Sequence, residues 1–196
     1  MKQYSLSQLV YLIYCKIRTY LTFPKARIIR FPIDIRGKKF IELDEGFTTG
    51  LGCRVEAYPQ GMDKTLFIGK NFQMNDYVHI TAAKSIVIGN NVLLASKIDI
   101  SDCTHGSYIG DENDSDPLSN PVDRPLSIKP VKIEDNVWLG EFVSVLPGVT
   151  IGKGTIVGAN SVVSKSLPPY VIAVGSPAKP IKFYNFENKR WEKYVN

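Results

Sequence analysis

The chain has 196 residues, which suits one domain with small terminal additions. It is 44% hydrophobic and 22% charged, an ordinary globular composition, and its net charge of +5 suits an anionic ligand. That charge is too small, without an accompanying aromatic-basic motif, to indicate nucleic-acid binding. Three widely spaced cysteines, Cys15, Cys53 and Cys103, form no disulfide framework and predict a reducing, cytoplasmic compartment.

Residues 1–30 are expected to form a helical extension, because apolar residues recur at helical spacing across residues 4–22. Ser5 or Ser7 can cap this helix and Pro24 stops it. Its apolar run is too short to span a bilayer and no signal-peptide cleavage site follows. Two roles stay open: packing over the end or side of the domain, or peripheral membrane contact at the inner face of the membrane.

A six-residue period organises the rest of the chain and is most regular between Ile133 and Pro168. Each unit there begins with an aliphatic residue and carries a small or β-branched residue at its fifth position, with Gly or Asn at many bends. This pattern is typical of a parallel β-helix, in which each unit forms one strand and one turn, and three units complete a coil. The units are IEDNVW, LGEFVS, VLPGVT, IGKGTI, VGANSV and VSKSLP.

The same period is present earlier, with a slip of two residues around Ala82–Ile86. We therefore predict an all-β domain over residues 31–182 and a tail or short helix over residues 183–196. The last early unit, ISDCTH, places Thr104 in the inward fifth position. The earlier units in phase are LDEGFT, TGLGCR, IGKNFQ, MNDYVH, IGNNVL, LASKID and ISDCTH.

The period stops after His105, and residues 106–130 are rich in Asp, Pro and Ser. A loop this long inside a compact repeat is usually functional, although a passive surface insertion is the alternative. His105 opens this excursion and is therefore a candidate catalytic residue. His79 falls in an outward slot, where an ordinary surface or interface residue is expected.

The string from Ile133 to Lys182, together with D-C-T-H-G-S-Y, R-P-L and V-W-L-G, resembles the hexapeptide-repeat acetyltransferases of the galactoside, maltose and nodulation-factor type. It looks most like the branch that O-acetylates bacterial surface polysaccharides such as O-antigen and capsule. The resemblance covers roughly residues 40–185. It implies a left-handed parallel β-helix and a homotrimer, with acetyl-CoA in the groove between subunits.

The resemblance also implies catalytic residues. A catalytic His falls on His105, whose neutral imidazole can remove the proton of a sugar hydroxyl as that hydroxyl attacks the thioester. An active-site Asn falls on Asn75, and Asp102 and Glu141 are candidates to orient the imidazole. A rival route uses Cys103 as a covalent nucleophile with His105 as its base.

For acetyl-CoA, small or basic positions near the end of the repeat match the family pattern. Lysines stand at two positions where the sugar acetyltransferases often have Arg, which removes bidentate phosphate contacts. In the excursion, Tyr108 and Arg124 are candidates to bind the sugar acceptor. The predicted cofactor-binding residues are Trp138, Ala159, Ser164, Lys165, Lys179 and Lys182.

The same fold also supports other functions. N-acetylation of an amino sugar or a small molecule uses the same cosubstrate, and no feature of the excursion excludes it. A carbonic anhydrase of this fold needs a three-His zinc site, whereas the chain has two histidines. No metal is therefore expected, and a purely structural β-helix would need neither His105 with its excursion nor the terminal lysines.

Overall fold

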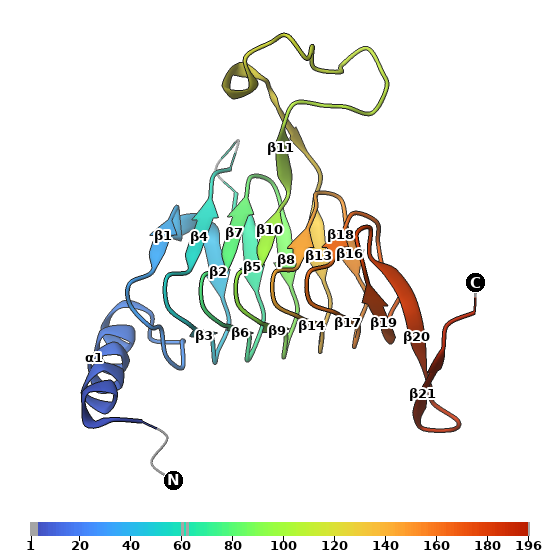
Figure 1. The fold of residues 1–196 in the computed structure, drawn as a ribbon. Coiled ribbons are helices and arrows are strands. Elements are labelled where there is room, and N and C mark those ends of the chain that lie inside the picture. Colours follow the sequence, from blue (N-terminus) through green and yellow to red (C-terminus); the bar gives the residue numbers. More distant parts are fainter. Residues whose placement is uncertain (1–3, 60, 62, 196) are drawn as a thin grey trace.

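The computed structural model describes residues 4–59, 61 and 63–195. The chain forms a prism of stacked coils, with one helix at its amino-terminal end, an arm leaving one edge and a hairpin at the carboxyl-terminal end (Figure 1). Three parallel sheets form the faces, and strands of successive coils pair within each sheet. This arrangement satisfies the backbone groups of every inner coil with those of the coils on either side.

Sheet A consists of β3 (Thr48–Thr49), β6 (Gln73–Met74), β9 (Leu93–Leu94), β14 (Trp138–Leu139), β17 (Ile156–Val157) and β19 (Val171–Val174), and is extended by β20 (Lys179–Asn185) and β21 (Arg190–Lys193). Sheet B consists of β1 (Asp34–Arg36), β4 (Arg54–Ala57), β7 (His79–Ala82), β10 (Asp99–Ser101), β15 (Ser144–Val145) and β18 (Val162–Val163). Sheet C consists of β2 (Ile41–Leu43), β5 (Leu66–Ile68), β8 (Ile86–Ile88), β13 (Val131–Ile133) and β16 (Thr150–Ile151). The remaining elements are α1 (Leu6–Thr22), the 3-10 turns η1 (Lys38–Phe40) and η2 (Pro121–Asp123), and a two-stranded ribbon of β11 (Cys103–His105) and β12 (Leu126–Ile128).

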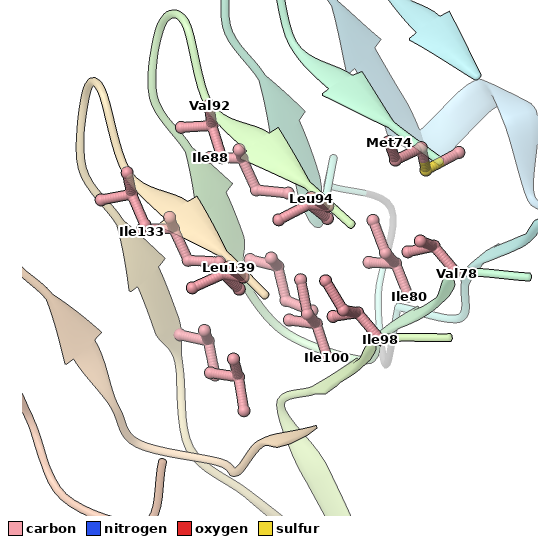
Figure 2. Close-up of a cluster of buried hydrophobic side chains, with 14 of the residues drawn as sticks. Met74, Val78, Ile80, Ile88, Val92, Leu94, Ile98, Ile100, Ile133 and Leu139 are labelled. Atoms are coloured by element: carbon pink, nitrogen blue, oxygen red, sulfur yellow. The ribbon is translucent and has the colours of Figure 1, made fainter. Parts of the chain in front are cut away.

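The interior is formed by the two inward positions of each six-residue unit, as the period predicts. The first residues of the six regular units are all 0% exposed, and the fifth residues are at most 4% exposed. Figure 2 shows side chains from all three sheets, among them Leu94, Ile100 and Ile133, gathered in this interior. Burial of each such side chain stabilises the fold by about 1.5–3 kcal/mol, so the stack itself is the main source of stability.

The turns between sheets C and A depend on asparagine. Asn71, Asn91 and Asn136 all have φ between 55° and 59°, a left-handed conformation that Asn tolerates well. Their side chains bond to one another along the prism, from Asn71 to Asn91 at 3.2 Å and from Asn91 to Asn136 at 3.3 Å. The bends seen in the sequence therefore form an aligned column.

The predicted amino-terminal helix is present, with Ser5 as its cap and Gln8 completing a capping box. Its packing differs from the usual pattern for an amphipathic helix. It contacts the body through the buried Cys15 and Thr19, whose hydroxyl accepts from the Ile29 backbone N–H at 2.8 Å, and through Tyr11, whose hydroxyl donates to the Phe31 backbone oxygen at 2.7 Å. Most of its apolar stripe is exposed.

Two predictions about local structure are wrong. Thr104 does not occupy an inward position and is exposed, because the chain leaves the coil at Asp102 and runs outward in β11. The tail does not end in a short helix, since β20 and β21 form an antiparallel hairpin that also crosses the expected boundary at residue 182. Aromatic residues favour this hairpin: Tyr184 stands opposite Trp191, with ring centroids 5.3 Å apart.

The stacked core leads to a stability prediction. Leu139→Ala should lower the free energy of unfolding by about 2–5 kcal/mol, because Leu139 is fully buried and its truncation leaves a cavity. Urea denaturation followed by circular dichroism at fixed protein concentration measures this. Ser144→Ala, on the outward side of β15, should change it by less than about 0.5 kcal/mol. An equal loss of unfolding free energy in the two variants would contradict the assignment of Leu139 to an inward position.

Candidate active site

The candidate functional residues lie on two different edges of the prism. We define edge AB by the turns from sheet A to sheet B, at residues 75–78, 95–98, 140–143 and 158–161. Edge BC comprises the segments from sheet B to sheet C, at residues 83–85, 102–130, 146–149 and 164–166. The site is described edge by edge because each edge holds a distinct part of the predicted chemistry.

His105 lies on edge BC, in the ribbon that carries the arm outward from the prism (Figure 1). The ribbon pairs His105 directly with Leu126, and directly opposed residues of an antiparallel pair project to the same side. Leu126 lines an open groove of about 400 Å³ together with Thr65, Ala83 and Lys84. The exposed imidazole is therefore on the side of the ribbon that faces this groove.

The arm is ordered by its own hydrogen bonds. Tyr108 donates its hydroxyl proton to the His105 backbone oxygen at 2.6 Å, and Arg124 donates to the Tyr108 hydroxyl at 2.8 Å. The same guanidinium donates to the Ser119 hydroxyl at 2.9 Å and to the Ser119 backbone oxygen at 2.8 Å. Tyr108 and Arg124, predicted to bind the acceptor, thus first act by shaping the loop behind His105.

Asp102 has another role than orienting the imidazole. It is 0% exposed, and its carboxylate accepts from the backbone N–H groups of Ala83, Lys84 and Ser85 at 2.7, 2.8 and 2.7 Å. These three bonds hold the turn of the preceding coil at the point where the repeat slips. All of its carboxylate contacts are made there, so Asp102 supports the base of the ribbon rather than His105.

Cys103 is on the ribbon two residues before His105, so both side chains project to the same side of the strand. Its sulfur lies 3.6 Å from the Ser101 hydroxyl oxygen. The thiol is partly exposed.

Edge AB holds Asn75, Glu141 and Ala159, with the turn at residues 95–98 between Asn75 and Glu141. Backbone bonds connect these turns along the prism: Asn75 donates to Leu94, Ala95 donates to Leu139 at 2.9 Å, and Gly140 donates to Val157 at 2.8 Å. Glu141 is exposed and Asn75 is partly exposed. These three residues therefore share one edge, which does not carry His105, and Asn75 lies two coils away from Glu141.

Two predicted cofactor-binding residues, Trp138 and Lys182, share one outward row of sheet A. Trp138 pairs with Ile156, Ile156 with Ile172 and Ile172 with Lys182. The indole is 48% exposed, and Lys179 begins the same β20 strand as Lys182. An apolar row that ends in exposed ammonium groups can accommodate a chain with a terminal phosphate.

Ser164 and Lys165 lie elsewhere, on edge BC after β18. Both are exposed. The predicted cofactor-binding residues thus divide into two groups, as the catalytic candidates do.

Two exposed aromatic residues on edge AB were not singled out in the sequence. Tyr77 and Phe142 each have φ 58° and are 60% and 51% exposed. A bulky side chain is uncommon in this conformation, which costs about 1–2 kcal/mol, and the Lys97 ammonium group of the preceding turn lies 4.9 Å from the centroid of the Phe142 ring. The sequence marks Phe142 as unusual, because it stands at the fourth position of its unit, where neighbouring units have Asn or Gly.

His79 belongs to a separate charged cluster on sheet B. Its Nε2 lies 3.4 Å from Glu56, its Nδ1 lies 3.4 Å from Asp99, and Arg54 also pairs with Glu56. Burial alone would raise the pKa of Glu56, but hydrogen bonds from Arg54, His79 and Tyr58 lower it below its usual range. Burial raises the pKa of Asp99. His79 is thus a member of an ion-pair network rather than an isolated surface residue.

In the described part of the chain, no group of three or more His, Cys, Asp or Glu side chains is arranged to hold a metal ion.

Comparison with known proteins identifies the family. Residues 130–165 match the family described as bacterial transferase hexapeptide (six repeats). WbbJ of Escherichia coli K12, assigned by name to O-acetyl transfer in lipopolysaccharide biosynthesis, is 44% identical over 192 residues, covering 98% of this chain and 96% of WbbJ. The chain belongs to the hexapeptide-repeat acetyltransferases. The predicted all-β left-handed parallel β-helix and the predicted acyltransferase class are thereby confirmed.

Two further proteins place this hexapeptide acetyltransferase among its relatives. Galactoside O-acetyltransferase of Escherichia coli K12 is 33% identical over 126 residues, covering 64% of this chain and 58% of that protein. The crystal structure of a mutant of AntD, an N-acyltransferase from Bacillus cereus, has a TM-score of 0.68. At 19% identity, over 94% of this chain and 92% of AntD, that likeness concerns the fold alone.

The strained aromatic turn leads to a testable prediction. Phe142→Asn should leave the free energy of unfolding unchanged or raise it by about 1 kcal/mol, because Asn adopts a positive φ more readily. The same variant should lose acetyltransferase activity if the ring is used at the site. The reverse change in an equivalent turn, Asn136→Phe, should destabilise the protein. A clear loss of stability in Phe142→Asn would instead make the ring a packing group.

Proposed function

We propose that this acetyltransferase transfers the acetyl group of acetyl-CoA to a sugar hydroxyl of a bacterial surface polysaccharide or its precursor. His105 acts as the general base, and each active site lies between edge BC of one subunit and edge AB of the next in a homotrimer. The main support is that the candidate residues of one chain fall on two separate edges of a rigid prism. The near full-length similarity to WbbJ supports the acceptor class.

The two-edge division supports a site shared between subunits. His105, Ser164 and Lys165 belong to edge BC, whereas Asn75 and Glu141 belong to edge AB. One ligand cannot bridge both edges of a single filled prism, because the core lies between them. A neighbouring copy related by rotation brings one edge of each kind together, and a three-fold ring closes this heterologous contact.

Acetyl-CoA fits the side chains available to it. Trp138 and the small Ala159 can line the pantetheine arm, while Lys179 and Lys182 offer positive charge to the phosphates. Ser164 and Lys165 contribute from the neighbouring edge BC. Lysine gives point charges rather than bidentate contacts, so the phosphates are held mainly by electrostatic attraction.

The proposed reaction needs no acyl-enzyme. The imidazole of His105 accepts the proton of the sugar hydroxyl while the hydroxyl oxygen attacks the thioester carbonyl carbon. Asn75 and backbone N–H groups of edge AB donate hydrogen bonds to the resulting oxyanion. The C–S bond then breaks, and the imidazolium returns its proton to the leaving CoA sulfur. Glu141 is positioned on the facing edge to orient the imidazole.

His105→Ala should lower kcat by about 10²–10⁴-fold, the usual contribution of a general base, while CoA binding persists. Thiol release from acetyl-CoA, measured against sugars, oligosaccharides and amino sugars, tests this and identifies the acceptor. His79→Ala is the matched control and should retain activity. Equal turnover of wild type and His105→Ala would refute the proposed base, and turnover with amino sugars alone would favour N-acetylation.

Cys103→Ser separates the direct route from a covalent one in the same assay. Most activity should remain, because direct transfer does not use the thiol. Complete loss in a variant that still folds would make Cys103 the nucleophile and His105 its base.

A further inference from the structure

The apolar face of α1 points away from the rest of the protein. Of the 17 residues from Leu6 to Thr22, only Cys15 and Thr19 are buried. The large apolar side chains at both ends of the helix are among the most exposed, with Leu6 at 79% and Leu21 at 75%. The exposed set is Leu6, Leu9, Val10, Ile13, Tyr14, Ile17, Tyr20 and Leu21.

These eight residues form one continuous face. At about 100° per residue they fall within an arc of about 140°, with Cys15 and Thr19 on the opposite side. The side with Cys15 and Thr19, together with the partly buried Tyr11 and Leu12, contacts the body, so the broader apolar face of the helix is the exposed one. Figure 1 shows α1 at the amino-terminal end of the prism, outside the stack of coils.

The charge of the protein is concentrated in the same region. The first 33 residues contain six of the 24 basic residues and none of the 19 acidic residues, which makes this segment +6. The other 163 residues hold 18 basic and 19 acidic residues, which makes them −1. Two of these cations, Lys16 and Arg18, are exposed and fall just outside the two borders of the apolar arc. Lys16 also donates to the Arg27 backbone oxygen at 2.5 Å, and Arg18 donates to the Tyr14 hydroxyl at 2.8 Å.

We propose that the exposed face of α1 binds the anionic lipid surface of a membrane, with the helix lying in the plane of the interface. The apolar arc enters the boundary between headgroups and acyl chains, and the flanking cations meet lipid phosphates. Tyr14 and Tyr20, at the two sides of the arc, suit this interface because each has an apolar ring and a polar hydroxyl.

Charge favours lipid over a second copy of the chain. Two α1 faces that met each other would bring like charges together, and the helix itself has no acidic residue to compensate them. No helix in the described residues is long and apolar enough to span a membrane. The contact is therefore peripheral, and it does not depend on the identity of the acceptor.

Flotation of the full-length protein with lipid vesicles tests this proposal. Wild type should float with vesicles that contain phosphatidylglycerol, bind phosphatidylcholine vesicles more weakly and dissociate as salt is raised. Ile13→Glu/Ile17→Glu should reduce the bound fraction by about tenfold or more, because two charges then occupy the centre of the arc. Lys16→Gln/Arg18→Gln should weaken binding to the anionic vesicles only.

The matched control is Val195→Glu, which adds a charge at an 84% exposed apolar residue that follows β21. It should float as wild type does. Circular dichroism and sedimentation without vesicles show whether each variant is folded and unchanged in mass. No flotation of wild type, or equal loss in Val195→Glu, would overturn the proposal. A smaller assembly in Ile13→Glu/Ile17→Glu would make the face a subunit interface instead.

Discussion

The six-residue register of the coils is the constraint on which the rest of the structure depends. Each inner strand pairs with the same short strand one coil before and one coil after, so every side chain keeps its direction along the prism. Inward positions are filled by aliphatic residues that are almost completely buried. Substitution of an inward residue in one coil therefore affects the packing of the neighbouring coils. Residues in the outward rows and turns are not constrained by the core and can serve in binding or catalysis.

This separation is the basis of the proposal that a neighbouring chain completes the site. Edge AB presents Asn75, Glu141 and the aromatic rings of Tyr77 and Phe142, while the arm of edge BC presents His105. The arm is ordered by its own contacts and by the buried Asp102 at its base, so the position of His105 is set before any partner arrives. Preorganisation of this kind suits general-base catalysis.

Much of the fold could be predicted from sequence, because the period is local and its phase directly selects the inward residues. The Ser5 cap and the family resemblance were equally accessible. The sequence does not show that Asn75 and His105 lie on different edges, because that depends on how many coils and corners separate them. Asp102 was assigned to the wrong partner because its amide donors are 17 to 19 residues away. The orientation of α1 was also hidden, since an apolar stripe normally indicates the buried side.

The central claim, that each active site combines two edges from adjacent subunits, is tested most directly by subunit mixing. His105→Ala and Asn75→Ala chains, each nearly inactive alone, would be co-expressed with different tags and the mixed assemblies purified. If the edges come from different chains, each mixed three-fold ring contains one complete site out of three, so the purified mixed assemblies should recover about a third of the wild-type activity. If both edges serve one site within a chain, every site in the mixture carries one of the two substitutions, and the absence of recovered activity would contradict the account.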